Sequence, residues 1–83
     1  MYYERIPVKT EAITLAGKAV KVDTAGLEAT VFAKGADVLI KANESVSDAD
    51  AFVLASGTSV RLCGTFFVKA EEADVRLLFC KLL

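Results

Sequence analysis

The chain has 83 residues, enough for one small domain, and it carries ten basic against eleven acidic side chains. A nearly neutral chain lacks the broad positive field that collects DNA phosphates, so we expect no nucleic-acid partner. It contains no histidine, which removes the commonest general base and metal ligand, and we therefore expect no enzyme, no metal site and no cofactor.

The first third of the chain predicts short extended segments. Residues 5–8 and 13–15 have strand composition, and Pro7 places the first of them at the edge of a sheet. Residues 19–22 alternate weakly between apolar and polar side chains. Turns are predicted between these segments at residues 16–18 and 23–26.

Two adjacent tyrosines, Tyr2 and Tyr3, precede these segments. We predict that residues 1–10 form an arm that docks on a neighbouring subunit, because tyrosine combines a large apolar ring with a polar tip. The same pair also suits a stacking platform for a sugar or a base.

One pattern of two strands occurs twice. Residues 30–34 lead through Gly35 into 36–41, and residues 65–69 lead into 73–78; each copy has a strand that ends in lysine before an Ala-Asp-Val strand. We predict two related β-hairpins. With the flanking segments they give an all-β domain over residues 1–83, a small antiparallel β-sandwich of jelly-roll type with about seven to eight short strands.

The connection of residues 43–50 is polar and acidic. Its carboxylates, Glu44, Asp48 and Asp50, are the candidates for acid–base chemistry, but Ser-rich and Asp-rich loops are typical of solvated turns, which we prefer here. The Asp48-Ala-Asp50 segment matches the opening of a calcium loop and lacks its remaining ligands and glycine.

Alternating strands continue at residues 51–54 and 59–63, with a turn at 56–58, and Gly64 separates them from the second copy of the repeat. In that copy Phe66, Val68 and Ala70 share one face and Phe67 lies on the other. Cys63 and Cys80 form no Cys-x-x-Cys arrangement, and we expect free, mostly buried thiols.

The last strand covers residues 74–83. A helix over residues 71–83 is the alternative, since Glu and Leu favour helices. We prefer the strand, because the counterpart at residues 37–40 is short and β-branched. Polar and apolar side chains alternate along a half-exposed strand, and residues 77–83 hardly show this alternation. Both faces of the segment are therefore predicted to be covered.

Two explanations fit this apolar segment. It is either the central strand of the core, covered on its second face by the N-terminal arm, or a subunit interface, which we favour. The chain supports the second explanation, because its 54% hydrophobic content exceeds the roughly 45–50% of soluble domains. The residues predicted for core and subunit contacts are Tyr2, Tyr3, Phe66, Phe67, Phe79, Leu82 and Leu83.

Three motifs carry a family resemblance: Lys-Gly-Ala-Asp-Val-Leu-Ile at 34–40, Phe-Val-Leu-Ala-Ser-Gly-Thr-Ser-Val at 52–60 and Ala-Asp-Val-Arg-Leu-Leu at 73–78. In these motifs roughly the last fifty residues of the chain resemble small accessory proteins of tailed-bacteriophage virions. The resemblance implies a β-sandwich or jelly-roll module that forms homo-oligomers, often trimers, and serves as a decoration or cement component beside capsid or tail proteins. It implies no catalytic residues.

We therefore expect a non-enzymatic, self-assembling structural protein. The alternative is a small carbohydrate-directed binding module with Tyr2, Tyr3 and the loop of residues 43–50 at its site. No apolar stretch approaches the ~20 residues that cross a bilayer, and the N-terminus lacks the apolar core of a secretion signal. These features predict a soluble protein made in the cytoplasm without a signal peptide and with no membrane partner. Assembly into a virion is what the family resemblance implies.

Overall fold

The computed structural model describes residues 4–83 and has six antiparallel strands in one sheet, in the order β1-β6-β2-β5-β3-β4. The predicted all-β antiparallel fold is confirmed, with six strands instead of seven to eight. The elements are β1 (Arg5–Leu15), β2 (Val20–Lys34), β3 (Val38–Lys41), the short 3₁₀ helix η1 (Asp48–Asp50), β4 (Phe52–Leu54), β5 (Ser59–Lys69) and β6 (Ala73–Leu82).

The strand number is lower because three long strands continue where breaks were expected. In β2, Ala25 and Gly26 have φ values of 51° and 84°, and the register with β5 shifts between Asp23 and Glu28. In β5, Gly64 has a φ of 91°. Such positive φ values produce bulges that bend a strand without ending it. Segments 5–8 and 13–15 likewise belong to one strand, β1, with a register shift between Pro7 and Lys9.

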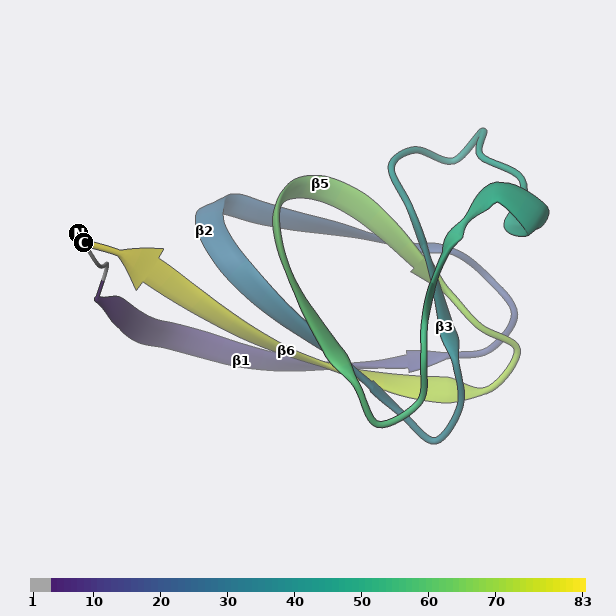
Figure 1. The fold of residues 1–83 in the computed structure, drawn as a ribbon, viewed down its shortest axis with the longest axis horizontal. Helices are drawn as coiled ribbons and strands as arrows, with labels where there is room; N and C mark the ends of the chain where they lie inside the picture. Colours follow the sequence, from purple (N-terminus) through teal and green to yellow (C-terminus); the bar gives the residue numbers. More distant parts are fainter. Residues whose placement is uncertain (1–3) are drawn as a thin grey trace.

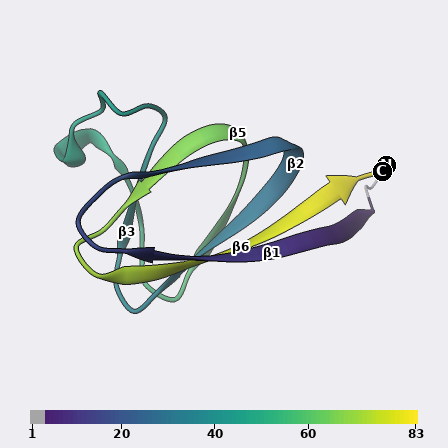
Figure 2. The ribbon, with the colours of Figure 1, turned by 180° about the vertical axis from the view of Figure 1, so that it is seen from behind.

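These bends fold the sheet over on itself, as Figures 1 and 2 show from opposite sides. The second half of β2 lies between β6 and the first half of β5, whereas the first half of β2 pairs with the second half of β5, which continues to β3 and β4. The two bends are tied together, because the buried Thr24 hydroxyl accepts a hydrogen bond of 2.7 Å from the Gly64 N–H.

The core lies between the two layers that this folding creates. Successive strand residues point to opposite faces, so every second side chain of the long strands points inward. The strand prediction for the C-terminal segment is confirmed, and so is the inward face of β5. The buried hydrophobic residues are Leu15, Val22, Ala29, Val31, Ala33, Val38, Ile40, Leu54, Phe66, Val68, Ala70, Ala73, Val75, Leu77 and Phe79.

The two copies of the repeat interlock, and the prediction that each forms a hairpin is wrong. Adding 35 to the numbers of Ala33 and Ile40 gives Val68 and Val75, and the structure pairs Ala33 with Val75 and Ile40 with Val68. Each strand of one copy therefore lies beside a strand of the other. The connection after Gly35 passes from one layer to the other, which lets the apolar faces of β2 and β3 meet across the core instead of lying side by side.

The strand order of the sheet is symmetric. If β1, β2 and β3 are exchanged with β4, β5 and β6, the new order is the old one read from the opposite edge of the sheet. The sheet thus has an internal pseudo-two-fold arrangement. Every one of its strand pairs joins one half to the other, and the free edges are β1 and β4.

Candidate interaction surfaces

The exposed large hydrophobic side chains of residues 4–83 fall into two groups. Ile6, Val8, Leu82 and Leu83 form the first, which we call the tip patch; Phe52 and Val53 form the second, the β4 patch. Each group includes side chains on both faces of the sheet, because consecutive strand residues such as Leu82 and Leu83 point to opposite sides. Each of these side chains is between 40% and 59% exposed. The patches lie toward opposite ends of a molecule that is 37 Å long, with the tip patch at the end where the chain termini meet (Figure 1).

The tip patch sits on a two-stranded ribbon. The pairing of β2 with β6 ends at Cys80, whereas β1 continues beside β6 to the pair Arg5–Leu82. The Leu83 N–H then donates a hydrogen bond of 3.0 Å to the Glu4 carbonyl. Beyond Cys80 the strand β6 therefore has β1 as its neighbour on one side and none on the other within residues 4–83.

Charged side chains of β1 connect this ribbon to the rest of the molecule. The Lys9 ammonium lies 4.8 Å from the centroid of the buried Phe79 ring, in cation–π geometry. The Arg5 Nε lies 2.8 Å from Glu28 Oε1, which connects the ribbon to β2. The ribbon is thus connected to β2 and to the core by two side chains, whereas its apolar side chains remain exposed.

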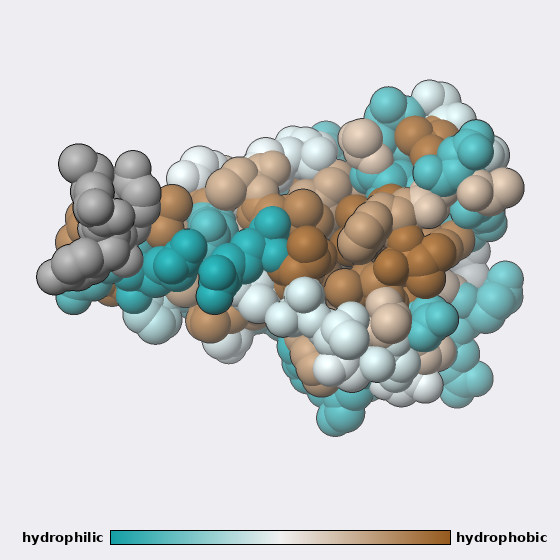
Figure 3. Space-filling view, viewed as in Figure 1, coloured by the Kyte–Doolittle hydropathy of each residue, from teal (hydrophilic) through white to brown (hydrophobic). Residues whose placement is uncertain are grey.

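An apolar cleft of about 330 Å³ opens beside the β4 patch. Its floor includes the core residues Ile40 and Phe66, and Phe52, Val60 and Leu62 form its walls. Apolar residues gather between β5 and β3 on this face (Figure 3). The cleft is therefore an opening into the core, between the two layers of the folded sheet.

The acidic connection next to this cleft has an ordered conformation. Asp48 accepts hydrogen bonds from the ammonium groups of Lys41 and Lys69, the second at 2.9 Å, and these two bonds hold the pKa of Asp48 below its usual 3.8. Asn43 Oδ1 accepts bonds from the backbone and hydroxyl of Ser45. A lowered pKa makes Asp48 a weaker base, which disfavours a role in acid–base catalysis. Its two lysine contacts instead attach the loop to the sheet.

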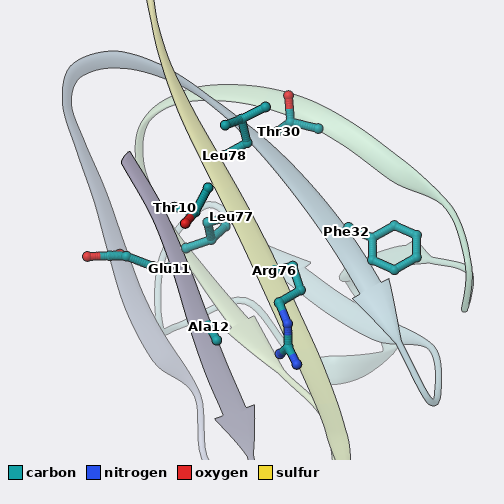
Figure 4. A pocket seen from close by; sticks show the side chains of 8 residues that line it. All are labelled: Thr10, Glu11, Ala12, Thr30, Phe32, Arg76, Leu77 and Leu78. Atoms are coloured by element: carbon teal, nitrogen blue, oxygen red, sulfur yellow. The ribbon is translucent and has the colours of Figure 1, made fainter. Parts of the chain in front are cut away.

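A second hollow, of about 630 Å³, lies on the outer face of β1, β6 and β2. Thr10, Thr30, Phe32 and Arg76 line it, and in Figure 4 the Glu11 side chain points away from Arg76. The nearest carboxylate to Arg76 is Asp74, with 4.0 Å between Nη1 and Oδ2. No group of three or more Cys, Asp or Glu side chains in residues 4–83 is arranged to hold a metal ion.

The predicted interface residues lie in different environments. Phe66 and Phe79 belong to the core and leave almost no surface for a partner, whereas Phe67 is half-buried on the outer face of β5. Leu82 and Leu83 are exposed at the tip. Tyr2 and Tyr3 lie outside the described residues. Among the predicted interface residues that the structure describes, Leu82 and Leu83 are the two that are exposed enough to contact a partner directly.

The two explanations for the C-terminal segment apply to different parts of it. From Asp74 to Cys80 the strand β6 lies between β1 and β2 with its inward face in the core, as a central strand does. Lys81 and Leu82 are exposed. The strand β1 lies beside β6 and not over its outer face, so the N-terminal residues of β1 do not provide the cover that the first explanation required.

The sequence interpretation missed Ile6, Val8, Phe52 and Val53. The available signal was the run Phe52-Val53-Leu54, which places apolar side chains on both faces of a three-residue strand. The carbohydrate site was predicted to combine the N-terminus with the loop of residues 43–50. The start of β1 and this loop lie at opposite ends of the molecule (Figure 1).

Both cysteines are free: Cys63 is exposed and Cys80 is buried, so the expected burial holds for one of them. Both pair in register with Glu28, one from each side. Two strand spacings separate them, roughly 10 Å, and a disulfide needs Cα atoms within about 7 Å. They are therefore not placed to bond to each other.

Comparisons of the chain with protein-family models, with curated proteins and with solved structures found no match. No helix within residues 4–83 has the length and apolar character needed to cross a membrane.

Proposed function

We propose that this protein is a non-enzymatic structural protein that works by joining copies of itself into a homo-oligomer. The observation that carries the proposal is the grouping of the exposed large hydrophobic side chains into the tip patch and the β4 patch. Scattered apolar residues are normal on a monomer, whereas grouped ones mark interaction sites. The β4 patch lies on a free edge strand, and the tip patch lies on the edge strand β1 and on the end of β6 beyond its pairing with β2; unpaired backbone groups at such edges invite a partner.

The energy available from the patches predicts a concentration-dependent assembly. Complete burial of a Leu, Ile or Val side chain contributes about 1.5–3 kcal/mol, so burying the exposed part of the tip patch contributes on the order of 4 kcal/mol. Association itself costs an estimated 4–15 kcal/mol of translational and rotational freedom. Because these terms are similar in size, monomers and oligomers should exchange over an accessible concentration range.

The setting that we propose is a bacteriophage particle. It rests on the resemblance of residues 34–40, 52–60 and 73–78 to virion accessory proteins, and on no other observation. In that setting the homo-oligomer would serve as a decoration or cement component against capsid or tail proteins.

The first test is the mass of the purified protein in solution. Sedimentation velocity over a wide concentration range should show species heavier than the monomer, and Leu82→Asp should shift the distribution to the monomer because it places a charge in the tip patch. Ala19→Asp, which adds the same charge at an exposed position outside both patches, is the control and should leave the distribution unchanged. A wild-type protein that stays monomeric at every concentration would contradict the proposal.

A further inference from the structure

We propose that two copies of this chain exchange halves when they fold together at high concentration, so that β1–β3 of each copy complete the sheet with β4–β6 of the other. The partner is a second copy of the chain, and the contact between the copies is the strand pairing itself. The inference goes beyond the association proposed above, because it uses neither the tip patch nor the β4 patch.

The pairing of the strands makes such an exchange complete. In the order β1-β6-β2-β5-β3-β4, every neighbour of a strand from β1–β3 belongs to β4–β6, and the reverse also holds. Neither half therefore pairs any two of its own strands. A half that turns to a second copy leaves no pairing of its own behind, and it finds all of its strand pairs again in that copy.

The same pairing identifies the partner. The open first half presents three strands whose register and inward faces match the missing second half; Val31, for example, lies between Val60 and Leu77. A second copy carries this half with the same sequence, so the backbone pairs and core contacts of the single chain are reproduced between the two chains. The exchange requires no further complementary surface.

One connection, residues 42–51, joins the halves, and it can open without exposing the core. It lies at one end of the molecule (Figure 1), and none of its residues is buried. Fully extended, residues 42–47 alone span roughly 20 Å. This length matches the molecule's shortest dimension of 20 Å, so two complete sheets fit side by side with both connections crossing between them.

The ion pairs of the connection survive the exchange. Asp48 and Lys69 both belong to the second half, so their contact stays within one chain. Asp48 also contacts Lys41 at the end of β3. Because β3 then lies beside β4 and β5 of the other copy, this second contact is remade between the chains.

The protein concentration during folding decides which form is made. In a dilute solution a chain closes on itself first, because its second half is tethered to the first and therefore has the higher effective concentration. In a concentrated solution the second half of another copy competes for the same strands. The exchanged dimer then separates slowly, since separation breaks every strand pair, as global unfolding does. Reciprocal exchange is two-fold symmetric and stops at the dimer.

The first experiment refolds the chain from urea at low and at high concentration, dilutes both samples to the same concentration and compares them by native mass spectrometry. Leu82→Asp is refolded beside the wild-type chain, because it places a charge in the tip patch and leaves the strand pairs in place. For both chains the concentrated sample should contain a dimer that persists after dilution, and the dilute sample should contain single chains.

A pair of cysteines shows which chain supplies each half. Ala12 of β1 and Arg76 of β6 are exposed partners in register. The Cα atoms of such partners lie about 4.5–5.5 Å apart, within reach of a disulfide. The variant carries Ala12→Cys and Arg76→Cys, with Cys63→Ser to remove the exposed native thiol. Oxidation should link two chains in the persistent dimer and should link each single chain to itself, which a non-reducing gel distinguishes.

The control, Ala12→Cys with Cys63→Ser, should give no linked dimer. A concentrated sample that returns to single chains on dilution overturns the exchange, and so does a persistent dimer whose cysteines link within one chain. Neither result affects the association through the patches, which the sedimentation of the wild-type protein tests. Thr30→Cys with Leu78→Cys, partners across β2 and β6, replaces the first cysteine pair if circular dichroism shows that it prevents folding.

Discussion

Asp48 is the side chain that fixes the acidic connection to the sheet. It accepts hydrogen bonds from Lys41 of β3 and Lys69 of β5, so one carboxylate joins the loop to two strands. The side chain of Lys41 is only 7% exposed, whereas that of Asp48 is 52% exposed. A buried ammonium without its counter-ion is strongly unfavourable, so the conformation near β4 depends on this carboxylate.

We predict that Asp48→Asn lowers stability at neutral pH and flattens its dependence on acid. Because the pKa of Asp48 in the folded protein lies below 3.8, its ionised form contributes stability above that pH, and the contribution is lost as pH falls through the lowered value. Urea unfolding from neutral pH to about pH 3 should therefore show a smaller loss for Asp48→Asn than for the wild type.

Asp50→Asn is the matched control, since Asp50 lies in the same loop and its recorded partner is the Ser47 hydroxyl, not a lysine. It should keep the pH dependence of the wild type. Parallel curves for the wild type and Asp48→Asn would show that the two lysine contacts contribute no stability.

At the scale of the strands, the contact between Thr24 and Gly64 connects the bends of β2 and β5. We predict that Thr24→Val destabilises the protein by about 1–3 kcal/mol, because valine has the same shape but leaves the Gly64 N–H without its acceptor. The midpoint of urea unfolding measures the change. Thr30→Val, the same substitution at a half-buried position of β2, is the control, and an equal effect of both substitutions would contradict a special role for the bend.

The bends also explain which parts of the fold the sequence could predict. Alternation identified the inward faces of β5 and β6, including Phe66, Val68 and Phe79, because side-chain direction in a strand is a local property. A glycine with positive φ suits a reversal and a bulge equally, so Gly64 did not show whether its strand ends. That outcome depends on β5 having the same partner, β2, on both sides of the bend, which is a non-local fact.

The candidate surfaces were predicted only in part, again because their exposure depends on strands that are distant in the sequence. The apolar run at the C-terminal end pointed to Leu82 and Leu83, but their exposure depends on where β2 stops pairing with β6. Phe52 has the alternation of a core residue, and nothing local indicates that the opposite layer stops before covering it. The missed residues are those whose environment is set by the length of a neighbouring strand.

For the molecule as a whole, we predict that neither half of the chain folds alone. Residues 1–46 contain β1 to β3 and residues 47–83 contain β4 to β6, and all strand pairs run between these two halves. Each fragment should lack a cooperative unfolding transition in circular dichroism. Mixing the fragments in equal amounts should restore the sheet signal and a single transition, since every strand then finds its partners.

Scrambled versions of the fragments, with the same composition, should not restore the signal and serve as the control. A cooperative transition in either fragment by itself would show that local pairing, such as a hairpin of residues 30–41, forms without the other half.

The interlocked order of the strands has a consequence for translation. The ribosome completes β1, β2 and β3 before any strand that pairs with them has emerged, so their inward faces stay unprotected while the second half is made. Sheets dominated by such distant pairings fold slowly, and open apolar strands are prone to aggregate meanwhile. The strand β6, which the ribosome makes after all the others, must then enter between β1 and β2.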